Sequence, residues 1–117
     1  MKNSRMHQRA GHSLRGLKEA WRQERSLRSQ AKYSLAGIVI LAVQQPSLLW
    51  WLLVLFVLAT ACAFELMNAA FEALIDHIHP GLHPNIRIAK DIASSAAFVL
   101  NCTAFLVTAC AIVDHLP

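Results

Sequence analysis

Charged residues are scarce in this chain: only 15% of its 117 residues are Asp, Glu, Lys or Arg, whereas 56% are hydrophobic. The cations are also unevenly placed, because nine of the 11 Lys and Arg residues lie within the first 32 positions. A soluble domain would scatter its charges over its surface. Membrane proteins instead concentrate Lys and Arg on the cytoplasmic side of their spans. The sequence therefore predicts a multi-pass membrane protein with a cytoplasmic amino terminus.

Other common features are also missing. The three cysteines, Cys62, Cys102 and Cys110, are odd in number, lie in apolar runs and lack metal-site spacing, so we interpret them as packing residues in buried helices. The first 30 residues hold no apolar core segment, so no cleavable signal peptide is expected. A Gly-rich phosphate loop of the P-loop or protein-kinase type is absent as well.

The amino-terminal segment, residues 1–30, is polar and basic. Residues 1 to about 12 are expected to form a partly mobile arm, followed by an amphipathic helix from Ser13 to about Gln30. Leu17 and Trp21 lie on its apolar stripe, which predicts a helix that rests on the membrane interface. No motif supports nucleic-acid binding by this basic segment, so no nucleic-acid partner is expected.

Residues 31–117 are predicted to form a domain of three transmembrane helices. The expected spans cover about residues 31–45, 48–76 and 88–114, and the first is short for a bilayer that needs about 20 residues. Pro46 separates the first two spans, and Pro80, Gly81 and Pro84 interrupt the chain before the third. The predicted fold is therefore all-α, with three transmembrane helices and one amphipathic surface helix.

Polar residues recur inside the apolar segments, where ionisable groups are costly and usually functional. At about 100° per residue, one face of the second span carries four of them: Glu65, Asn68, Glu72 and Asp76. A stripe of the third span, with Asp91 beside it, carries Lys90, Ser94, Asn101 and Thr108. The outer part of the second span, residues 48–59, is apolar throughout. The pattern thus predicts a site open to the cytoplasm rather than a channel.

These residue types favour phosphoryl transfer. Glu72, paired with Glu24 of the surface helix, would hold Mg²⁺ while substrate phosphates complete its shell. Glu65 lies deeper, where it would accept the proton of an attacking lipid hydroxyl. Lys90 would offset phosphate charge, and positioning with electrostatic stabilisation is most of what phosphoryl transfer requires. The expected partners are ATP, a membrane lipid alcohol and the bilayer.

Several alternatives stand beside this interpretation. Glu65 would serve equally as the coupling carboxylate of a small proton-coupled transporter, although such transporters usually have four spans and carry that carboxylate in the first. Asn68 is of a type that often links helices by hydrogen bonds. His77, His79 and His83 would suggest a metal site, but they lie in a loop with proline between them.

The segment ELMNAAFEALID, from Glu65 to Asp76, together with Ala89-Lys90-Asp91, resembles the signature of the bacterial diacylglycerol kinase and undecaprenol kinase family. The resemblance implies a homotrimer in the bacterial cytoplasmic (inner) membrane, with sites built between neighbouring subunits and with Mg²⁺ and ATP bound there. It implies that Glu65 is the catalytic base and that Glu24 and Glu72 are the metal ligands.

Matching positions imply further roles. The nucleotide-binding set is Arg5, His12, Glu24, Glu72, Gly81, Leu82, His83, Lys90 and Asp91. Asn68 and Asp76 complete the polar shell, and Arg28, Glu65 and Ser94 approach the lipid. The expected reaction phosphorylates diacylglycerol to phosphatidic acid, with undecaprenol as the alternative acceptor. Two residues depart from the family pattern. His12 stands where Tyr is common, and Gln30 stands where the diacylglycerol branch has an acidic residue. His83-Pro84 resembles the undecaprenol branch.

Overall fold

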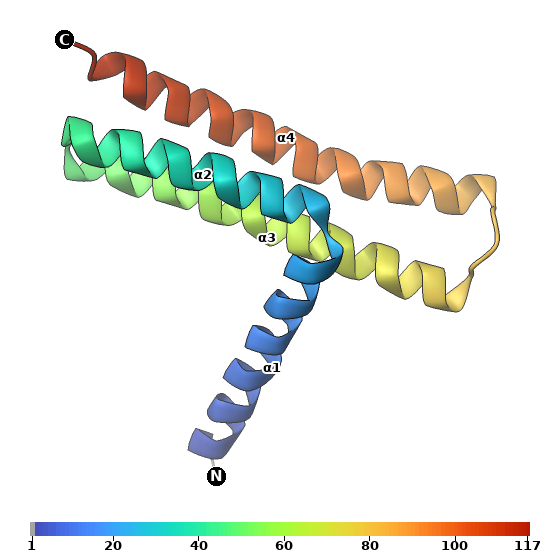
Figure 1. Ribbon diagram of the computed structural model, residues 1–117. Coiled ribbons are helices and arrows are strands. Elements are labelled where there is room, and N and C mark those ends of the chain that lie inside the picture. The colour runs from blue at the N-terminus through green and yellow to red at the C-terminus, as the bar shows by residue number, and fades with distance from the viewer. Residues whose placement is uncertain (1) are drawn as a thin grey trace.

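The fold is described from a computed structural model, which places the backbone of residues 2–117 and the side chains of residues 5–117. Every regular element in this part of the chain is an α-helix, which confirms the expected all-α class. The helices, drawn in Figure 1, are α1 (Lys2–Gln23), α2 (Arg25–Gln44), α3 (Leu48–Ile78) and α4 (Pro84–Asp114).

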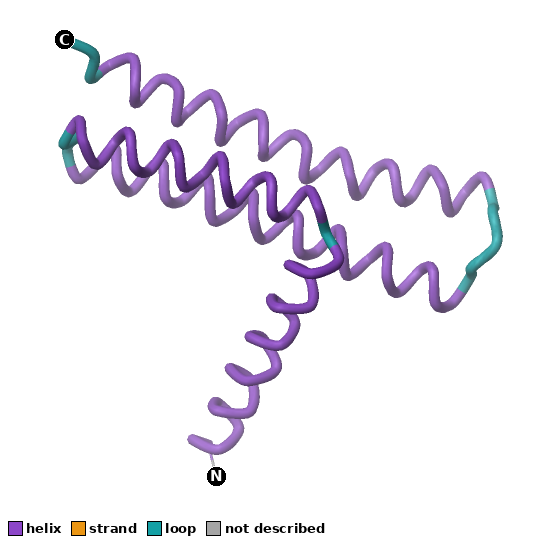
Figure 2. The backbone as a smooth tube through the Cα atoms, viewed as in Figure 1, coloured by secondary structure: helices purple, strands orange, loops and turns teal. Residues whose placement is uncertain are grey.

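Three of the helices form an antiparallel bundle. α2, α3 and α4 run alongside one another, and α1 projects away from them at a steep angle (Figure 1). The connecting loops are short (Figure 2), and the most extensive helix packing is between α3 and α4. The carboxyl terminus lies at the same end of the bundle as the α2–α3 turn, whereas the α3–α4 loop lies at the opposite end.

Two helices of the described chain are long and apolar enough to cross a membrane. They are α3 and α4, with 31 residues each and mean hydropathies of 2.1 and 2.2 over their most apolar stretches. Phe56, Phe98 and Phe105 on these helices are between 67% and 78% exposed, as expected of side chains that face lipid. Cys102 and Cys110 are exposed too, so their expected burial is wrong. The span over residues 31–45 stays a prediction.

The boundary between α1 and α2 differs from the expected one. α1 ends at Gln23, and Glu24 has extended backbone angles (φ −103°, ψ 108°), so the single helix expected over Ser13–Gln30 is broken. Residues 2–12, expected to be a mobile arm, are the first part of α1. Residues 2–12 contain no proline, so α1 continues through them without a break.

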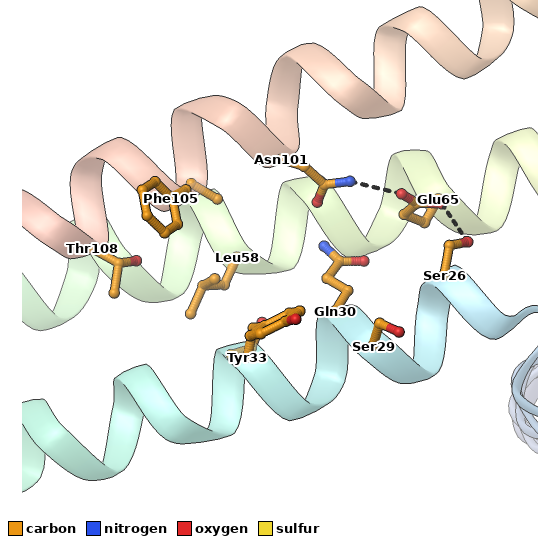
Figure 3. A pocket seen from close by; sticks show the side chains of 11 residues that line it. Ser26, Ser29, Gln30, Tyr33, Leu58, Glu65, Asn101, Phe105 and Thr108 are labelled. Carbon is orange, nitrogen blue, oxygen red and sulfur yellow. Dashed lines mark hydrogen bonds between the residues drawn. The ribbon is translucent and has the colours of Figure 1, made fainter.

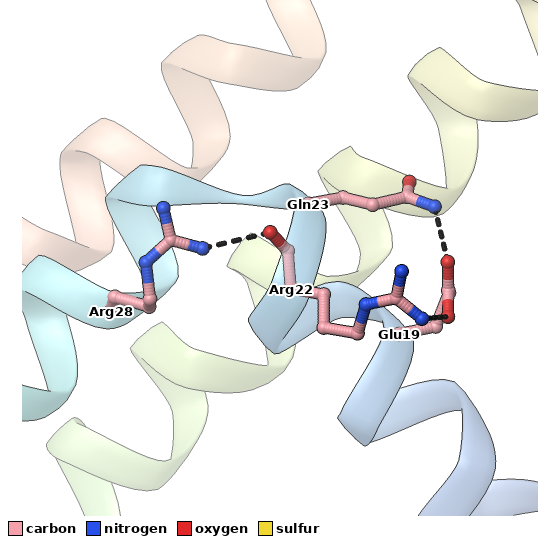
Figure 4. A network of polar contacts seen from close by, with 4 residues as sticks. All are labelled: Glu19, Arg22, Gln23 and Arg28. Atoms are coloured by element: carbon pink, nitrogen blue, oxygen red, sulfur yellow. Dashed lines mark hydrogen bonds and ion pairs between the residues drawn. The ribbon is translucent and has the colours of Figure 1, made fainter.

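Arg28 holds the break in place from outside α1. Its Nη1 donates hydrogen bonds to the carbonyl oxygens of Trp21, at 2.6 Å, and Arg22, at 2.9 Å. Figure 4 shows the guanidinium reaching back to Arg22. The last carbonyls of a helix have no partner within the helix, and a cation beside them also complements the helix dipole. A side chain four residues beyond Glu24 thus caps the preceding helix, which no local motif indicated.

α4 begins at Pro84, four residues before the span expected from Ile88. His83 is its N-cap residue, and its Nδ1 accepts a hydrogen bond from the backbone N–H of Asn85 at 3.1 Å. Pro84 occupies the first helical position, where its missing N–H is harmless. The proline that interrupts the loop therefore also starts the helix.

Small residues let the bundle helices approach closely. Ala97, Ala104 and Ala111 of α4 recur at every seventh position and are buried. Leu41, Val54 and Ala111 form a small apolar core near the α2–α3 turn. Because only methyl side chains separate the backbones at these positions, the helices gain van der Waals contact, which stabilises helix pairs in a membrane.

Gly37 marks a close approach of α2 to α4, because a Cβ added there would lie 3.0 Å from Cγ2 of Thr108. Gly37→Val is expected to destabilise the bundle by about 1–3 kcal/mol through overpacking, measured as thermal unfolding in detergent. Thr108→Ser, which removes that methyl group, should restore part of the loss. Gly16→Val is the matched control, since nothing lies within 4 Å of a Cβ there. An equal loss at both glycines would contradict the packing explanation.

Candidate functional site

Glu65 links three helices through its side chain. Its Oε1 accepts a hydrogen bond from Nδ2 of Asn101 in α4 at 2.7 Å, and its Oε2 accepts one from Oγ of Ser26 in α2 at 3.3 Å (Figure 3). Asn101 belongs to the polar stripe seen in the sequence. Ser26 was not singled out, because it lies in another helix whose alignment with α3 is not encoded locally. The two donors fix the direction in which the carboxylate points.

A cavity of about 570 Å³ opens beside Glu65. One end is polar, and the other runs between apolar side chains of α3 and α4 (Figure 3). The residues that line it are Ser26, Ser29, Gln30, Tyr33, Ser34, Leu58, Glu65, Asn101, Ala104, Phe105 and Thr108. A cavity with a polar end and an apolar body suits an amphipathic ligand.

Some buried polar atoms in the described chain have no hydrogen-bond partner. They are Nε2 and Oε1 of Gln30, Oε1 of Gln44, Oδ1 of Asn68 and Oγ1 of Thr108. Native proteins pair most such atoms, so each exception requires a reason. Gln30 and Thr108 both line the cavity beside Glu65, where a ligand would reach them.

A second cavity, of about 280 Å³, lies at the end of the bundle where α3 and α4 are joined. It gathers many of the side chains that the sequence placed in the nucleotide and lipid sets, from α3, the loop and α4. Those shared with the predicted sets are Glu72, Gly81, Leu82, His83, Lys90, Asp91 and Ser94. Arg87 also lines this cavity, although no sequence pattern indicated a role for it. The cavity is therefore lined by positively charged side chains, by carboxylates and by residues of the α3–α4 loop.

Lys90, which lines this cavity, forms an ion pair with the end of α3. Its Nζ forms an ion pair with Oδ1 of Asp76, which joins α3 to α4 beside the loop. The side chain of Asp76 is 61% exposed, so this pair contributes modestly to stability. Its main consequence is positional, because it holds the Lys90 ammonium at the edge of the cavity that Glu72 lines.

Glu24 and Glu72, the expected metal ligands, do not line the same cavity. Glu24 lies in a groove against Ala69, Ala70 and Ala73 of α3. Among the described residues, no group of three or more His, Cys, Asp or Glu side chains is close enough to hold a metal ion. Glu72 by itself fits Mg²⁺, which commonly takes one or two carboxylates and completes its shell with phosphates and water.

Arg5, His12 and Arg28 lie away from both cavities. Arg5 and His12 are on α1, where Nδ1 of His12 contacts Nη2 of Arg15 at 2.7 Å. Nη1 of Arg28 donates instead to the carbonyl oxygens at the end of α1. Ser94 lines the cavity near Glu72, and not the one beside Glu65. A single chain therefore does not bring the whole predicted nucleotide set or the whole lipid set together.

The apolar helices, the deep carboxylate and the cavity at the loop define a membrane-type helical bundle with two adjoining polar sites. A family model described as prokaryotic diacylglycerol kinase matches residues 11–112. The chain belongs to this family, which confirms the resemblance seen in the sequence. Family membership and the two apolar helices indicate a membrane location.

Curated relatives carry two different names. The undecaprenol kinase of Bacillus subtilis is 30% identical over 88 residues, which cover 75% of this chain and 72% of that protein. The diacylglycerol kinase of Helicobacter pylori strain J99 is 32% identical over 88 residues, covering 75% and 69%. The diacylglycerol kinase of Escherichia coli K12 is 29% identical over 90 residues, covering 77% and 74%.

Proposed function

We propose that this protein is a lipid kinase that transfers the γ-phosphoryl group of ATP to the hydroxyl of diacylglycerol and so forms phosphatidic acid. The observation that carries the proposal is the position of Glu65. Its carboxylate lies at the polar end of an amphipathic cavity and is oriented by Ser26 and Asn101. Membership of a kinase family weighs against the proton-coupled transporter.

The chemistry follows from the arrangement of the two cavities. A lipid alcohol in the cavity beside Glu65 places its hydroxyl at the carboxylate, which accepts the proton as the hydroxyl oxygen attacks the γ-phosphorus. The bond from that phosphorus to the β,γ-bridging oxygen breaks, and ADP leaves. Glu65 and Glu72 are seven residues apart on α3, which is about 10 Å along the helix. A nucleotide with its γ-phosphate reaching from Glu72 toward Glu65 spans this distance.

The loop-side cavity is the proposed nucleotide site. Lys90 and Arg87 supply positive charge, and Glu72 is the proposed ligand for Mg²⁺, which neutralises phosphate charge when it is bound. Glu24 lines a separate groove of the same chain, so we infer that Glu24 of a neighbouring subunit completes the ligand pair in a homotrimer. Arg5 and His12 on the projecting α1 would reach the nucleotide across the same subunit boundary.

The proposed orientation places α1, the Glu72 cavity and the α3–α4 loop on the cytoplasmic side of the inner membrane. α1 carries much of the positive charge of the chain, and its exposed Leu17 and Trp21 form an apolar stripe for the interface. α2 is the proposed third span, with Arg25 and Arg28 at its cytoplasmic end. ATP is made in the cytoplasm, so this orientation gives the nucleotide direct access.

Undecaprenol is the second candidate acceptor, because the undecaprenol kinase of Bacillus subtilis is about as similar in sequence to this chain as the diacylglycerol kinases are. Purified protein in detergent micelles should be given Mg-ATP with diacylglycerol, with undecaprenol or with no lipid, and labelled phosphate in lipid measured. We expect labelled phosphatidic acid, formed at a rate at least about tenfold higher than the rate of undecaprenol phosphorylation. This ratio corresponds to a difference of about 1.4 kcal/mol in activation free energy between the two lipids. Label in undecaprenol alone would select the alternative acceptor, and ATP hydrolysis without lipid phosphorylation would refute the kinase.

A further inference from the structure

Gln30 presents an unpaired amide to the cavity beside Glu65. Both its Nε2 and its Oε1 are buried without a hydrogen-bond partner, although Ser29, Ser34 and Asn101 line the same cavity. In Figure 3 the side chain extends from α2 into the space between the helices, toward Asn101 and Glu65. A buried amide without a partner is destabilising, so its presence at a ligand cavity calls for an explanation.

The depth of Gln30 relative to Glu65 indicates which part of a ligand would meet it. Ser26, which donates to Glu65, lies one helical turn before Gln30 on α2. The amide is therefore attached about 6 Å farther along the helix, on the side away from the α3–α4 loop. A lipid with its hydroxyl at Glu65 has the next few atoms of its backbone at this level, and its chains continue toward Leu58 and Phe105.

Lipid alcohols differ in the chemical groups that lie next to the hydroxyl, at the depth of Gln30. A diacylglycerol has an ester carbonyl only a few covalent bonds from its free hydroxyl, and the carbonyl oxygen accepts hydrogen bonds. A polyprenol has hydrocarbon there, and would leave both polar atoms of Gln30 buried and unpaired. A site built to hydrogen-bond a substrate group discriminates strongly against an analogue that lacks this group.

We propose that Gln30, which stands where the diacylglycerol branch has an acidic residue, is a specificity residue particular to this chain, and that its Nε2 donates a hydrogen bond to an ester carbonyl of the acceptor lipid. This inference rests on the proposed lipid kinase function and narrows its acceptor to acylglycerols. Gln30 touches the substrate away from the reacting atoms, so it determines which alcohol is accepted and leaves proton transfer to Glu65.

The test compares dioleoylglycerol with its dialkyl ether analogue, which has the same hydroxyl and chains but no carbonyl. Wild-type protein is expected to show a kcat/KM about 10- to 100-fold higher with the diester, the range for one buried hydrogen bond. Gln30→Met keeps the size of the side chain and removes its donor. This variant should lose most of the diester rate, keep the ether rate, and so bring the ratio close to one.

Gln44→Met is the matched control. Gln44 is another part-buried glutamine of α2, and its Nε2 donates to the carbonyl oxygen of Ile112 at 3.1 Å, outside the cavity. Its substitution should leave the diester-to-ether ratio unchanged. Equal losses with both lipids in Gln30→Met would show a packing role and overturn the inference.

The wild-type ratio keeps the inference testable even where a variant fails to fold. Equal kcat/KM values for the two lipids in the wild-type protein would overturn the role of Gln30 and leave the kinase function standing. Absence of phosphorylation of diester, ether and undecaprenol alike would instead refute the kinase function itself. The two failures are therefore distinguishable in one set of assays.

Discussion

Glu65→Gln is expected to lower the turnover of lipid phosphorylation by about a thousandfold, within the range for loss of a general base. Gln has nearly the same shape as Glu, and its Oε1 can still accept the hydrogen bond that Asn101 donates at 2.7 Å. An amide cannot take the proton of the lipid hydroxyl at neutral pH, so chemistry is lost while the helix contacts remain. Initial rates with saturating lipid and ATP measure the effect.

Nucleotide binding distinguishes a base from a structural residue. Because Glu65 does not line the cavity near Glu72, Glu65→Gln should bind Mg-ATP within about twofold of the wild type, a change of about 0.4 kcal/mol. Glu19→Gln provides the control: Glu19 is an exposed carboxylate of α1 that contacts Gln23 at 2.6 Å, and its loss should leave turnover unchanged. Unchanged turnover in Glu65→Gln would refute the base assignment. Loss of nucleotide affinity would instead move Glu65 into the nucleotide site.

Apolar runs and proline positions carried enough information to predict most of the fold. The long run that starts at Leu48 and the one after Pro84 are the two helices that meet the criteria for crossing a membrane. The break at Glu24 escaped prediction because neither Gly nor Pro marks it. The helix end there is stabilised by Arg28, whose hydrogen bonds run backwards across the junction. Such caps depend on the three-dimensional path of the chain.

The site was predictable where its residues follow one another on a single helix. Glu65 and Glu72 share a face of α3 because helical spacing places them there, and Lys90 meets Asp76 across the α3–α4 loop that joins their helices. Contacts between helices distant in sequence were not predictable. Ser26 reaches Glu65 only through the packing of α2 on α3. That Gln30 has no partner likewise depends on every neighbour around it, which a local pattern does not specify.

Glu72→Ala is expected to remove most of the Mg²⁺-dependent part of nucleotide binding, a loss on the order of 100-fold in affinity. Glu72 is the carboxylate of α3 in the loop-side cavity, beside the cations that would hold the phosphates. Binding of a non-hydrolysable ATP analogue should be measured with Mg²⁺ and with a chelator. Asp76→Ala is the comparison, because it frees Lys90 without removing the proposed metal ligand, and so should act equally in both conditions. An intact Mg²⁺ dependence in Glu72→Ala would place the metal elsewhere.

Mixed oligomers test where the second carboxylate comes from. Glu24 and Glu72 line separate cavities of one chain, so a metal site that needs both should be shared between subunits. Glu24→Ala and Glu72→Ala should each be inactive alone. When the two variants are co-assembled, some interfaces pair an intact Glu24 with an intact Glu72 of the neighbour, and part of the kinase activity should return. A site formed within one chain would show no recovery at any mixing ratio, because every subunit would then lack one of its own two ligands.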